Sequence, residues 1–212
     1  YVPCPAGPEA LADAILWVEP GRTGIVPGVS QANPPDVMRG EEVQIFGAAA
    51  LGEIAEDSLV CHPGTHAKWI GLSGGRITAF RTLVTGELFA LLREHSILAS
   101  LLDAPVEDND AFNAGVDDAF AGTSLLSGLF GLRARSLLGS GATDSASRAS
   151  GLLIGTDVRE GLAFGPSDRI ALIGRPDLNR LYAAAITRAG RTTHSVDGGN
   201  AFLAGIRLLT EM

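Results

Sequence analysis

The chain has 212 residues, a mass of 21.9 kDa and a formal charge of -8, with a pI near 4.9. An acidic chain without a run of Lys or Arg is a poor partner for nucleic acid or an anionic membrane surface, and no window holds the roughly 18 consecutive apolar residues that a membrane-spanning helix needs. Cys4 and Cys61 are far apart and lack a metal-type spacing, so we expect no disulfide bond and a soluble, cytoplasmic protein that acts on small molecules.

The first quarter of the chain predicts a helix over 9–18, a strand over 23–29 and a loop over 30–35. Asp36 follows a Pro pair and precedes a helical pattern that runs from 37 to about 52, so we expect it to cap that helix. An Asp in that place is usually a cap worth about 1 kcal/mol. The alternative is a carboxylate that accepts a proton from a substrate hydroxyl as it attacks phosphorus.

The rest of the chain predicts a sheet flanked by helices. Thr85 begins a helix with Leu88, Leu91, Leu92 and Ile97 as its expected buried stripe, and residues 110–138 give one long or two consecutive helices. Strands early and strand-helix alternation late predict a mixed α/β fold with a central sheet. The remaining predicted strands are 59–62, 69–72, 77–82, 170–173 and 192–196, and the remaining helices are 143–161, 177–189 and 199–210.

The segment His62-Pro-Gly-Thr-His-Ala-Lys-Trp69 lies between two of these strands and has the composition of a phosphate contact. Gly64 lets the backbone approach an anion, Thr65 offers a hydroxyl and an amide, and Lys68 offers a mobile positive charge. The alternative is a tight hairpin in which these residues only satisfy backbone geometry.

Two further features of the sequence bear on binding. His62 and His66 have a zinc-like spacing of four, but the Pro-Gly pair between them excludes the helix that would place both on one face, and we predict no metal site there. Gly174 ends a strand before a helix, and Gly198 and Gly199 start the last helix. Both patterns fit the approach of a flat ligand, but sheet-helix packing or a plain helix start is the commoner reason for them.

Four contiguous motifs together resemble the 2-dehydro-3-deoxygalactonokinase family of bacterial sugar-acid kinases. They are PPDVMRGEEVQIFG, HPGTHAKW, TGELFALLREHSIL and ALIGRPDLNRLYAAAITRAG, and the match runs from Tyr1 to the last helix. The resemblance implies the superfamily of sugar kinases, actin and heat-shock ATPases, in which two ribonuclease-H-like lobes close around ATP. It also implies ATP and Mg²⁺ as cofactors, and phosphorylation of 2-dehydro-3-deoxy-D-galactonate to its 6-phosphate in galactonate and galactose catabolism.

The resemblance also assigns roles to single residues. Asp36 would be the catalytic base, and residues 173–177 would border the adenosine. The expected nucleotide-binding residues are Gly64, Thr65, His66, Lys68, Gly174, Gly198 and Gly199. The expected sugar-acid-binding residues are Arg39, Thr85 and Glu87, with helix capping as the alternative for the last two.

One part of the superfamily pattern has no counterpart in this sequence, namely an Asp-Gly-Thr strand-turn-strand that forms a first phosphate hairpin. We therefore expect a first lobe that is incomplete at the N-terminus, with residues 1–57 as its remainder and 58–212 as the second lobe. Two alternatives to the kinase reading stay open: a non-catalytic ligand-binding protein of the same fold, and a kinase for another 2-keto-3-deoxy sugar acid. A second copy of the chain is left open as a partner.

Overall fold

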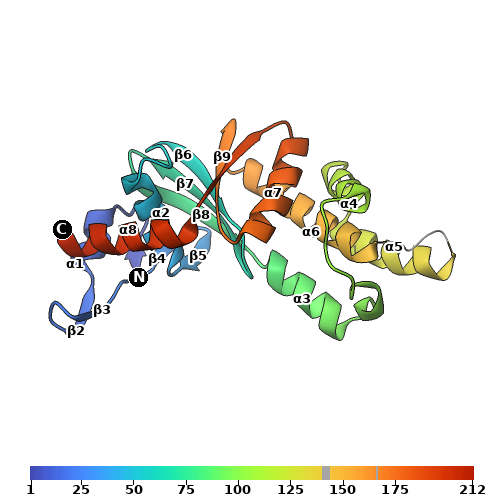
Figure 1. Ribbon diagram of the computed structural model, residues 1–212, viewed down its shortest axis with the longest axis horizontal. Coiled ribbons are helices and arrows are strands. Elements are labelled where there is room, and N and C mark those ends of the chain that lie inside the picture. The colour runs from blue at the N-terminus through green and yellow to red at the C-terminus, as the bar shows by residue number, and fades with distance from the viewer. Residues whose placement is uncertain (140–143, 166) are drawn as a thin grey trace.

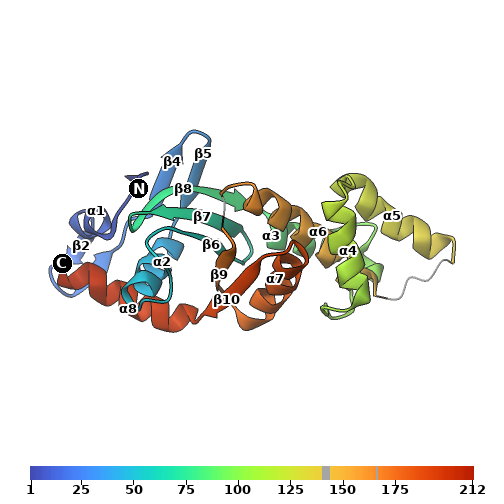
Figure 2. The same ribbon diagram turned by 90° about the horizontal axis from the view of Figure 1, so that it is seen from above.

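A computed structural model describes residues 1–139, 144–165 and 167–212 of the chain. The molecule is elongated, with a sheet and its covering helices in one half and a group of helices in the other (Figure 1). Both termini lie at the same end of the long axis (Figures 1 and 2). Within the described ranges, no helix is long and apolar enough to cross a membrane.

A five-stranded sheet is the centre of the fold, and its strands lie in the order β10-β9-β6-β7-β8. The strands β6, β7 and β8 form an antiparallel meander, whereas β9 and β10 run parallel to β6. All five were predicted, and their bounds are β6 (Ser58–His62), β7 (Ala67–Ser73), β8 (Arg76–Leu83), β9 (Arg169–Ile173) and β10 (Thr192–Val196).

Both faces of this sheet are covered, because its side chains alternate between two apolar clusters. Val60 packs into the cluster formed with α2 (Glu41–Ala50) and α8 (Gly198–Glu211). Its neighbours Leu59 and Cys61 pack into the cluster on the opposite face, which includes side chains of α6 (Ser145–Leu162) and α7 (Pro176–Arg188). The predicted start of α6 at Thr143 lies outside the described residues.

The helices α2 and α8 cross in backbone contact, and glycine makes this possible. A Cβ atom on Gly47 would lie 1.8 Å from the carbonyl oxygen of Ala201, and one on Gly205 would lie 2.0 Å from that of Val43. Any side chain at either position would force the two helices apart.

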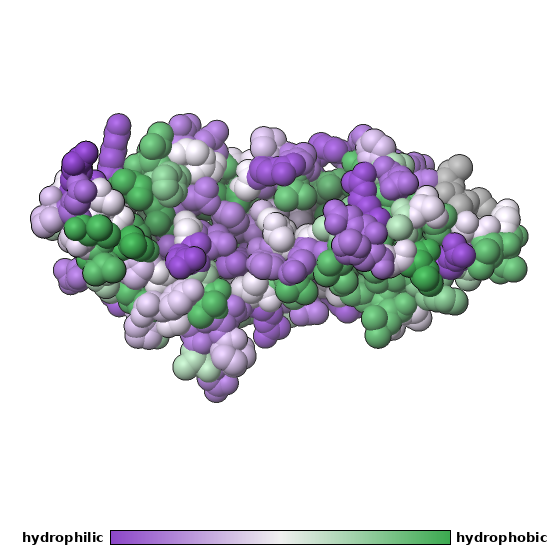
Figure 3. All heavy atoms as spheres, turned by 90° about the horizontal axis from the view of Figure 1, so that it is seen from below, coloured by the Kyte–Doolittle hydropathy of each residue, from purple (hydrophilic) through white to green (hydrophobic). Residues whose placement is uncertain are grey.

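The helical half of the molecule is built from α3 (Thr85–His95), a short 3-10 turn at Ala99–Leu101, α4 (Asp110–Phe120), α5 (Leu125–Leu137) and part of α6. The segment 110–138 thus forms two helices, separated near Gly122, whose φ is +83°. The expected buried stripe of α3 is wrong: no α3 residue is buried, and Leu91 and Ile97 are exposed, because only one side of this helix meets a neighbour. On the face shown in Figure 3, apolar side chains gather toward both ends of the molecule, and the surface between them is mostly polar.

The N-terminal segment is richer in strands than predicted. Three strands form a small sheet in the order β1-β4-β5, and two more form an exposed hairpin, so residues 30–35 are not the expected loop. The predicted helix over 9–18 ends early, because residues 16–19 turn into the hairpin. The bounds are β1 (Val2–Pro3), α1 (Pro8–Asp13), β2 (Leu16–Glu19), β3 (Thr23–Ile25), β4 (Val29–Ala32) and β5 (Pro35–Met38).

The prediction that Asp36 caps a helix is wrong. Asp36 lies within β5, and α2 begins five residues later at Glu41. The physical reason is that its carboxylate is engaged elsewhere: it accepts hydrogen bonds from the backbone N–H of Thr82 at 2.7 Å and from the Thr82 hydroxyl at 2.8 Å. These bonds hold β5 in extended conformation beside β8.

The boundary expected between residues 57 and 58 falls within one continuous apolar cluster. Met38 and Phe46, from the N-terminal side, share this cluster with Ile70 and Phe80 of the sheet. The division into two lobes therefore stays a prediction, and the packing gives no break at that position.

Candidate functional site

Three segments that are distant in sequence meet at one edge of the central sheet. The turn at residues 63–66 follows β6, Gly174 follows β9, and Asp197 follows β10. Because these three strands are parallel, their carboxyl ends lie at the same edge. Ligands of open α/β sheets bind at this kind of edge.

The turn packs directly on the first residues of α3. The backbone N–H of Glu87 donates to the carbonyl oxygen of Thr65 at 2.9 Å, and the side chains of His66 and Glu87 are 2.7 Å apart. A Cβ atom on Gly86 would lie 2.4 Å from the carbonyl oxygen of Gly64, so only glycine allows this approach. The turn is thus held in place by the helix N-terminus.

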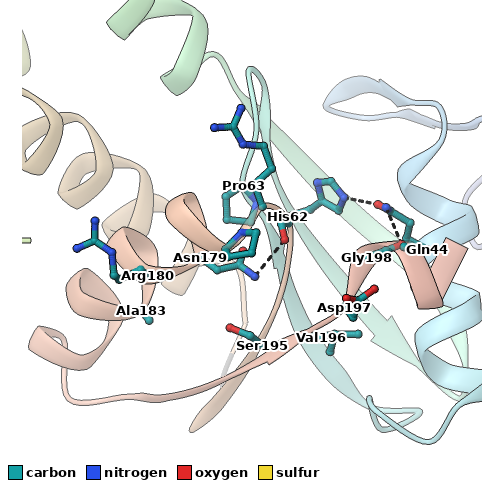
Figure 4. Close-up of a pocket in the computed structure, with 14 residues that line it drawn as sticks. Gln44, His62, Pro63, Asn179, Arg180, Ala183, Ser195, Val196, Asp197 and Gly198 are labelled. Atoms are coloured by element: carbon teal, nitrogen blue, oxygen red, sulfur yellow. Dashed lines mark hydrogen bonds between the residues drawn. The ribbon is translucent and has the colours of Figure 1, made fainter. Parts of the chain in front are cut away.

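A hydrogen-bond chain joins the other side of the turn to α8. The side-chain oxygen of Gln44 lies 2.5 Å from Nε2 of His62, and its amide group donates to the carbonyl oxygen of Gly198 at 3.0 Å (Figure 4). Burial lowers the pKa of His62, which favours the neutral ring with its proton on Nε2, facing the Gln44 oxygen. Gln44 therefore fixes the turn relative to the start of α8.

Lys68 is not the mobile charge that the sequence suggested. It is the only lysine in the chain, its residue is 5% exposed, and its Nζ lies 3.1 Å from Oε1 of Glu41 at the start of α2. Alternation of side chains along β7 places Lys68 on the face of the sheet that α2 covers, so its side chain points toward α2 rather than toward the turn. A buried ion pair of this kind holds elements together as much as it offers charge to a ligand.

A second glutamate at the start of α2 is fully buried. Both carboxylate oxygens of Glu42 lie 2.8 Å from the backbone nitrogen of Gly40, whose φ is +110°. Burial raises the pKa of Glu42 to about 7, although the hydrogen bond from Gly40 acts in the opposite direction. Local sequence patterns do not reveal this burial, because Glu41 and Glu42 differ only in which face of α2 they occupy.

A cavity of about 700 Å³ opens between α7, the end of β10 and the start of α8 (Figure 4). Its wall includes Gly174, Gly198 and Gly199, and the starts of both helices face it. Asn179, 4% exposed, also lines it: its amide group donates weakly to the carbonyl oxygens of Leu172 and Gly174, and its side-chain oxygen has no hydrogen-bond partner among the described residues. We call this space the polar cavity, after the Asn179 and Asp197 side chains in its wall.

A second cavity, of about 520 Å³, lies on the other side of the turn, between α3, α6 and α7. We call it the apolar cavity after the side chains of Phe89, Val106, Leu153, Ile154, Leu178 and Leu181, which share its wall with polar residues that include Thr65, Arg93, Ser150 and Asp177. The two cavities share Pro63, Arg175 and Arg180. The turn is therefore the ridge between two neighbouring hollows, with two arginines beside it.

The structure places the residues that the sequence singled out in three groups. Gly64, Thr65 and Thr85 line the apolar cavity, and Gly174, Gly198 and Gly199 line the polar cavity. The others line neither of these two cavities, and they are Asp36, Arg39, His66, Lys68 and Glu87.

Sequence reasoning missed a buried carboxylate below the apolar cavity. Asp157 of α6, 2% exposed, accepts hydrogen bonds from the Nε1–H of Trp69, the hydroxyl of Tyr182 and the hydroxyl of Thr85. An Asp in the middle of a helix without a motif around it gives no signal, since its three partners come from distant segments.

Comparison with known proteins gives a consistent result. A family model described as 2-keto-3-deoxy-galactonokinase matches residues 1–209. The chain belongs to this family.

Two curated relatives of this family member are similar over most of the chain. A protein from Rhizobium meliloti (strain 1021), assigned as a 2-dehydro-3-deoxygalactonokinase, is 40% identical over 191 residues, which are 86% of this chain. The 2-dehydro-3-deoxygalactonokinase of Escherichia coli (strain K12) is 38% identical over 196 residues, which are 91% of this chain. The matched regions span 62% and 64% of the lengths of these two relatives.

Solved structures agree with the family assignment and extend the fold comparison. A crystal structure of a protein from Sinorhizobium meliloti assigned as a 2-dehydro-3-deoxygalactonokinase superposes with a TM-score of 0.91 at 34% identity, covering 100% of this chain and 73% of that one. Component A of (R)-2-hydroxyglutaryl-CoA dehydratase from Acidaminococcus fermentans gives a TM-score of 0.51 at 16% identity over 79% of this chain and 66% of that one, a likeness of fold alone. The predicted mixed α/β fold class is thereby confirmed.

Proposed function

We propose that this protein transfers the γ-phosphoryl group of ATP to the 6-hydroxyl of 2-dehydro-3-deoxy-D-galactonate in cytoplasmic galactonate catabolism. In this reaction the hydroxyl oxygen forms a bond to the γ-phosphorus, the bond from that phosphorus to the β,γ-bridging oxygen breaks, and ADP leaves. The observation that carries the proposal is the family match over residues 1–209, joined with a turn that separates two ligand-sized cavities.

The nucleotide fits best across the turn, with its base in the apolar cavity. Contact with apolar side chains such as Phe89 and Leu178 would stabilise a flat base. The volume of this cavity, about 520 Å³, lies within the range of small-molecule sites. The phosphates would then lie against the backbone of Gly64 and Thr65, within reach of Arg175 and Arg180, which would exchange their ion pairs with Asp177 and Asp108 for the phosphates. Arginine is suited to this role because its planar group can donate two parallel hydrogen bonds to phosphate.

The polar cavity would hold the part of the ligands that neither the apolar cavity nor the turn contacts. Gly174, Gly198 and Gly199 leave backbone N–H groups near the starts of α7 and α8, where negative charge is favoured. We keep these three glycines as nucleotide-side contacts that adjoin the phosphates.

Asp36 stays our candidate for the general base, and its surroundings refine the role. It shares the turn end of the sheet with Thr82 and Lys68, which are paired across β7 and β8. There it would accept the proton of the sugar hydroxyl during attack. Arg39 would contact the sugar-acid carboxylate, and Glu87, which already contacts His66, would hold the turn.

The described residues do not present a ready magnesium site. They contain no cluster of three or more His, Cys, Asp or Glu side chains that could hold a metal ion. The carboxylates near the turn are already bonded: Asp36 to Thr82, Glu41 to Lys68 and Asp177 to Arg175. Mg²⁺ commonly arrives with the phosphates of ATP and keeps several waters, so we route no step through it.

We also assign residues 58–212 to one ribonuclease-H-like lobe of the actin-like ATPase superfamily. The support is the strand order β8-β7-β6-β9-β10, an antiparallel meander followed by two parallel strands, and the helices on both faces. The small sheet β1-β4-β5 would belong to the other lobe.

The test is a coupled assay of ADP release with 2-dehydro-3-deoxy-D-galactonate as substrate, run on the 212-residue chain beside the Rhizobium meliloti relative as positive control. We expect turnover with this acid to exceed that with the gluconate epimer. Calorimetry with ATP is run on the same sample, and light scattering gives its oligomeric state.

Three other outcomes would change the proposal. A faster rate on the gluconate epimer would replace the substrate. ATP or sugar-acid binding with no turnover, while the control is active, would replace the kinase by a ligand-binding protein of the same fold. Absence of both binding and turnover would remove the proposal.

A further inference from the structure

One edge of the central sheet is covered by other parts of the chain, and the opposite edge is bare. Along β8, the backbone N–H groups of Phe80 and Thr82 donate to the side chains of Gln31 and Asp36 at 3.0 and 2.7 Å, and a backbone bridge from the N-terminal segment covers the start of the strand. Along β10, the described residues supply only β9 as a neighbouring strand, and Figure 2 shows β10 at the margin of the sheet. A bare edge is a template for another strand.

The backbone of β10 points two residues outward, away from β9. Thr192 pairs with Arg169, and its N–H donates to the carbonyl oxygen of Asp168 at 2.9 Å, so the backbone polar groups of Thr192 face β9. This direction alternates along a strand, and the N–H and C=O groups of Thr193 and Ser195 therefore face outward. Within the described part of the chain, neither of these N–H groups has an acceptor.

The composition of β10 does not protect this edge. Natural sheets block a free edge with Lys, Pro or other charged side chains. The strand Thr192–Val196 reads TTHSV, which contains no Pro, Lys, Arg, Asp or Glu, and its β-branched residues favour an extended chain. Charge occurs only just outside the strand, with Arg191 before it and Asp197 after it. The two ends of the edge therefore carry opposite signs.

A two-fold axis at His194 would make this edge complementary to itself. Two copies of one edge related by such an axis run antiparallel, so Thr193 of each copy lies opposite Ser195 of the other. Because both residues point outward, each of these two pairs can exchange two backbone hydrogen bonds. The same register places Arg191 opposite Asp197 of the second copy, whereas an axis at Thr193 or Ser195 would lose this charge pairing.

The opposite charges are free to meet. Arg191 and Asp197 lie on one face of the strand because their separation is even, and the backbone of Asp197 is still extended, with φ -71° and ψ 109°. The ion pair that Arg191 makes within its own chain is with Asp168, whose side chain is 98% exposed, and such surface pairs hold an arginine only weakly. Opposite charges directly across two strands stabilise the pairing.

Apolar surface beside the edge would be covered as well. Leu51 and Leu203 are 52% and 61% exposed, and together with Val196 they line a groove of about 430 Å³ at the end of β10. In the register above, Val196 lies opposite Thr192 of the second copy, which brings that chain beside the groove. This matters because backbone hydrogen bonds alone give little net free energy in water.

We propose that β10 is the dimerisation edge of this protein, where two copies pair antiparallel about an axis at His194 and join their five-stranded sheets into one. Each His194 keeps its own contact, since its Nε2 lies 2.7 Å from the carbonyl oxygen of Glu53 in the same chain. Ser195 lines the polar cavity, so the second copy would form part of the rim of that cavity. The inference does not depend on the proposed function, because its tests measure no activity.

A cross-linking experiment tests the register. The two His194 residues would be directly opposite each other without hydrogen bonds between them, with Cα atoms about 4.5 Å apart, which suits a disulfide bond. His194→Cys should therefore link two chains on mild oxidation, as seen on a non-reducing gel. Thr192→Cys is the matched control, since its two copies would lie about 13 Å apart along the strands and should not link. The wild type, with Cys4 and Cys61, gives the background.

Sedimentation over a dilution series gives the dissociation constant of the dimer. Thr193→Pro removes the outward N–H without touching the pairing with β9, and it should raise this constant at least about 30-fold, whereas Thr193→Val should stay within about threefold. Arg191→Glu would face Asp197 and should raise the constant at least about tenfold. Arg22→Glu makes the same change of charge in the exposed β2–β3 hairpin and should have no effect. Melting temperatures show whether each variant is folded.

The outcomes are distinct. Cross-linking of His194→Cys but not Thr192→Cys, together with a dimer that Arg191→Glu weakens, would uphold the proposal even if Thr193→Pro does not fold. Monomers throughout the dilution series would overturn it and leave the edge to an extended segment of another protein. A dimer that folded Thr193→Pro and Arg191→Glu leave intact, or equal cross-linking of the two cysteine variants, would also overturn it, because the copies would then meet at another surface.

Discussion

Gly86 offers the sharpest test of how α3 holds the phosphate-side turn. A Cβ atom at this position would lie 2.4 Å from the carbonyl oxygen of Gly64 and 2.9 Å from the Cα of Thr65, whereas ordinary contact begins near 3.4 Å. Gly86→Ala must therefore push the turn and α3 apart by about 1 Å, because both contacted groups are backbone. Overpacking of this kind costs about 1–3 kcal/mol.

The gain in helix propensity from Gly to Ala is at most about 1 kcal/mol, so we expect a net loss of stability of about 1–2 kcal/mol. For a chain of this size, that corresponds to a fall in melting temperature of about 3–6 °C. Since the turn is displaced as well, ATP affinity should fall by about tenfold or more, in line with the sensitivity of positioned sites to shifts of about 1 Å.

The assay is urea unfolding together with calorimetry of ATP binding, and Gly131→Ala in α5 is the matched control. Nothing lies within 4 Å of a Cβ atom at Gly131, so this change should be neutral or stabilise by up to about 1 kcal/mol, without an effect on ATP. The reasoning is refuted if Gly86→Ala is as stable as Gly131→Ala and binds ATP as the wild type does.

Three further substitutions test the residues around the turn. Burial raises the pKa of Glu42 from 4.5 to about 7, so the folded state binds the proton more tightly, and the free energy of unfolding should fall by up to about 3 kcal/mol as the pH rises from 4.5 to 7. Glu42→Gln should abolish this pH dependence in urea unfolding, and parallel pH profiles of the wild type and the variant would contradict the prediction. Lys68→Met leaves Glu41 without its partner and should lower the free energy of unfolding by about 2–3 kcal/mol, less than for a fully buried pair. Adding Glu41→Gln should restore about half of that loss, and no recovery in the double variant would show that the broken ion pair does not cause the loss. Asp36→Asn should lower turnover at least about 100-fold with ATP affinity nearly unchanged, whereas the turnover of Thr82→Val, which keeps the carboxylate, should stay within about tenfold of the wild type. If Asp36→Asn loses stability but retains turnover, Asp36 only pairs the strands and is not the general base.

The sheet and the late helices could be predicted from the sequence because their signals are local. The alternation of apolar residues along 59–62 and 77–82, and the glycine turn at 73–75, each depend on neighbouring residues only, and the structure confirms these strands. The helix over 177–189 was equally clear, since its apolar face recurs at helical spacing and Gly190, with φ +75°, follows its end.

The predictions that failed concern residues whose partners are distant in the chain. Asp36 has the local pattern of a helix cap, yet Thr82, 46 residues away, takes its carboxylate and keeps the segment extended. Lys68 was expected to be mobile, but strand alternation turns it toward Glu41. Asp157 could not be found at all, because its role exists only where four elements meet.

The crossing of α2 and α8 connects the core of the fold to the turn. Helices with ordinary side chains between them pack with their axes about 8–10 Å apart, and Gly47 and Gly205 allow a closer approach. Because the helices are this close, Gln44, one turn before Gly47, reaches both the carbonyl oxygen of Gly198 and the ring of His62. The distance between the turn and the start of α8, and with it the width of the polar cavity, is therefore set by a contact inside the core, so that a substitution at the crossing can alter binding at this edge without touching a ligand.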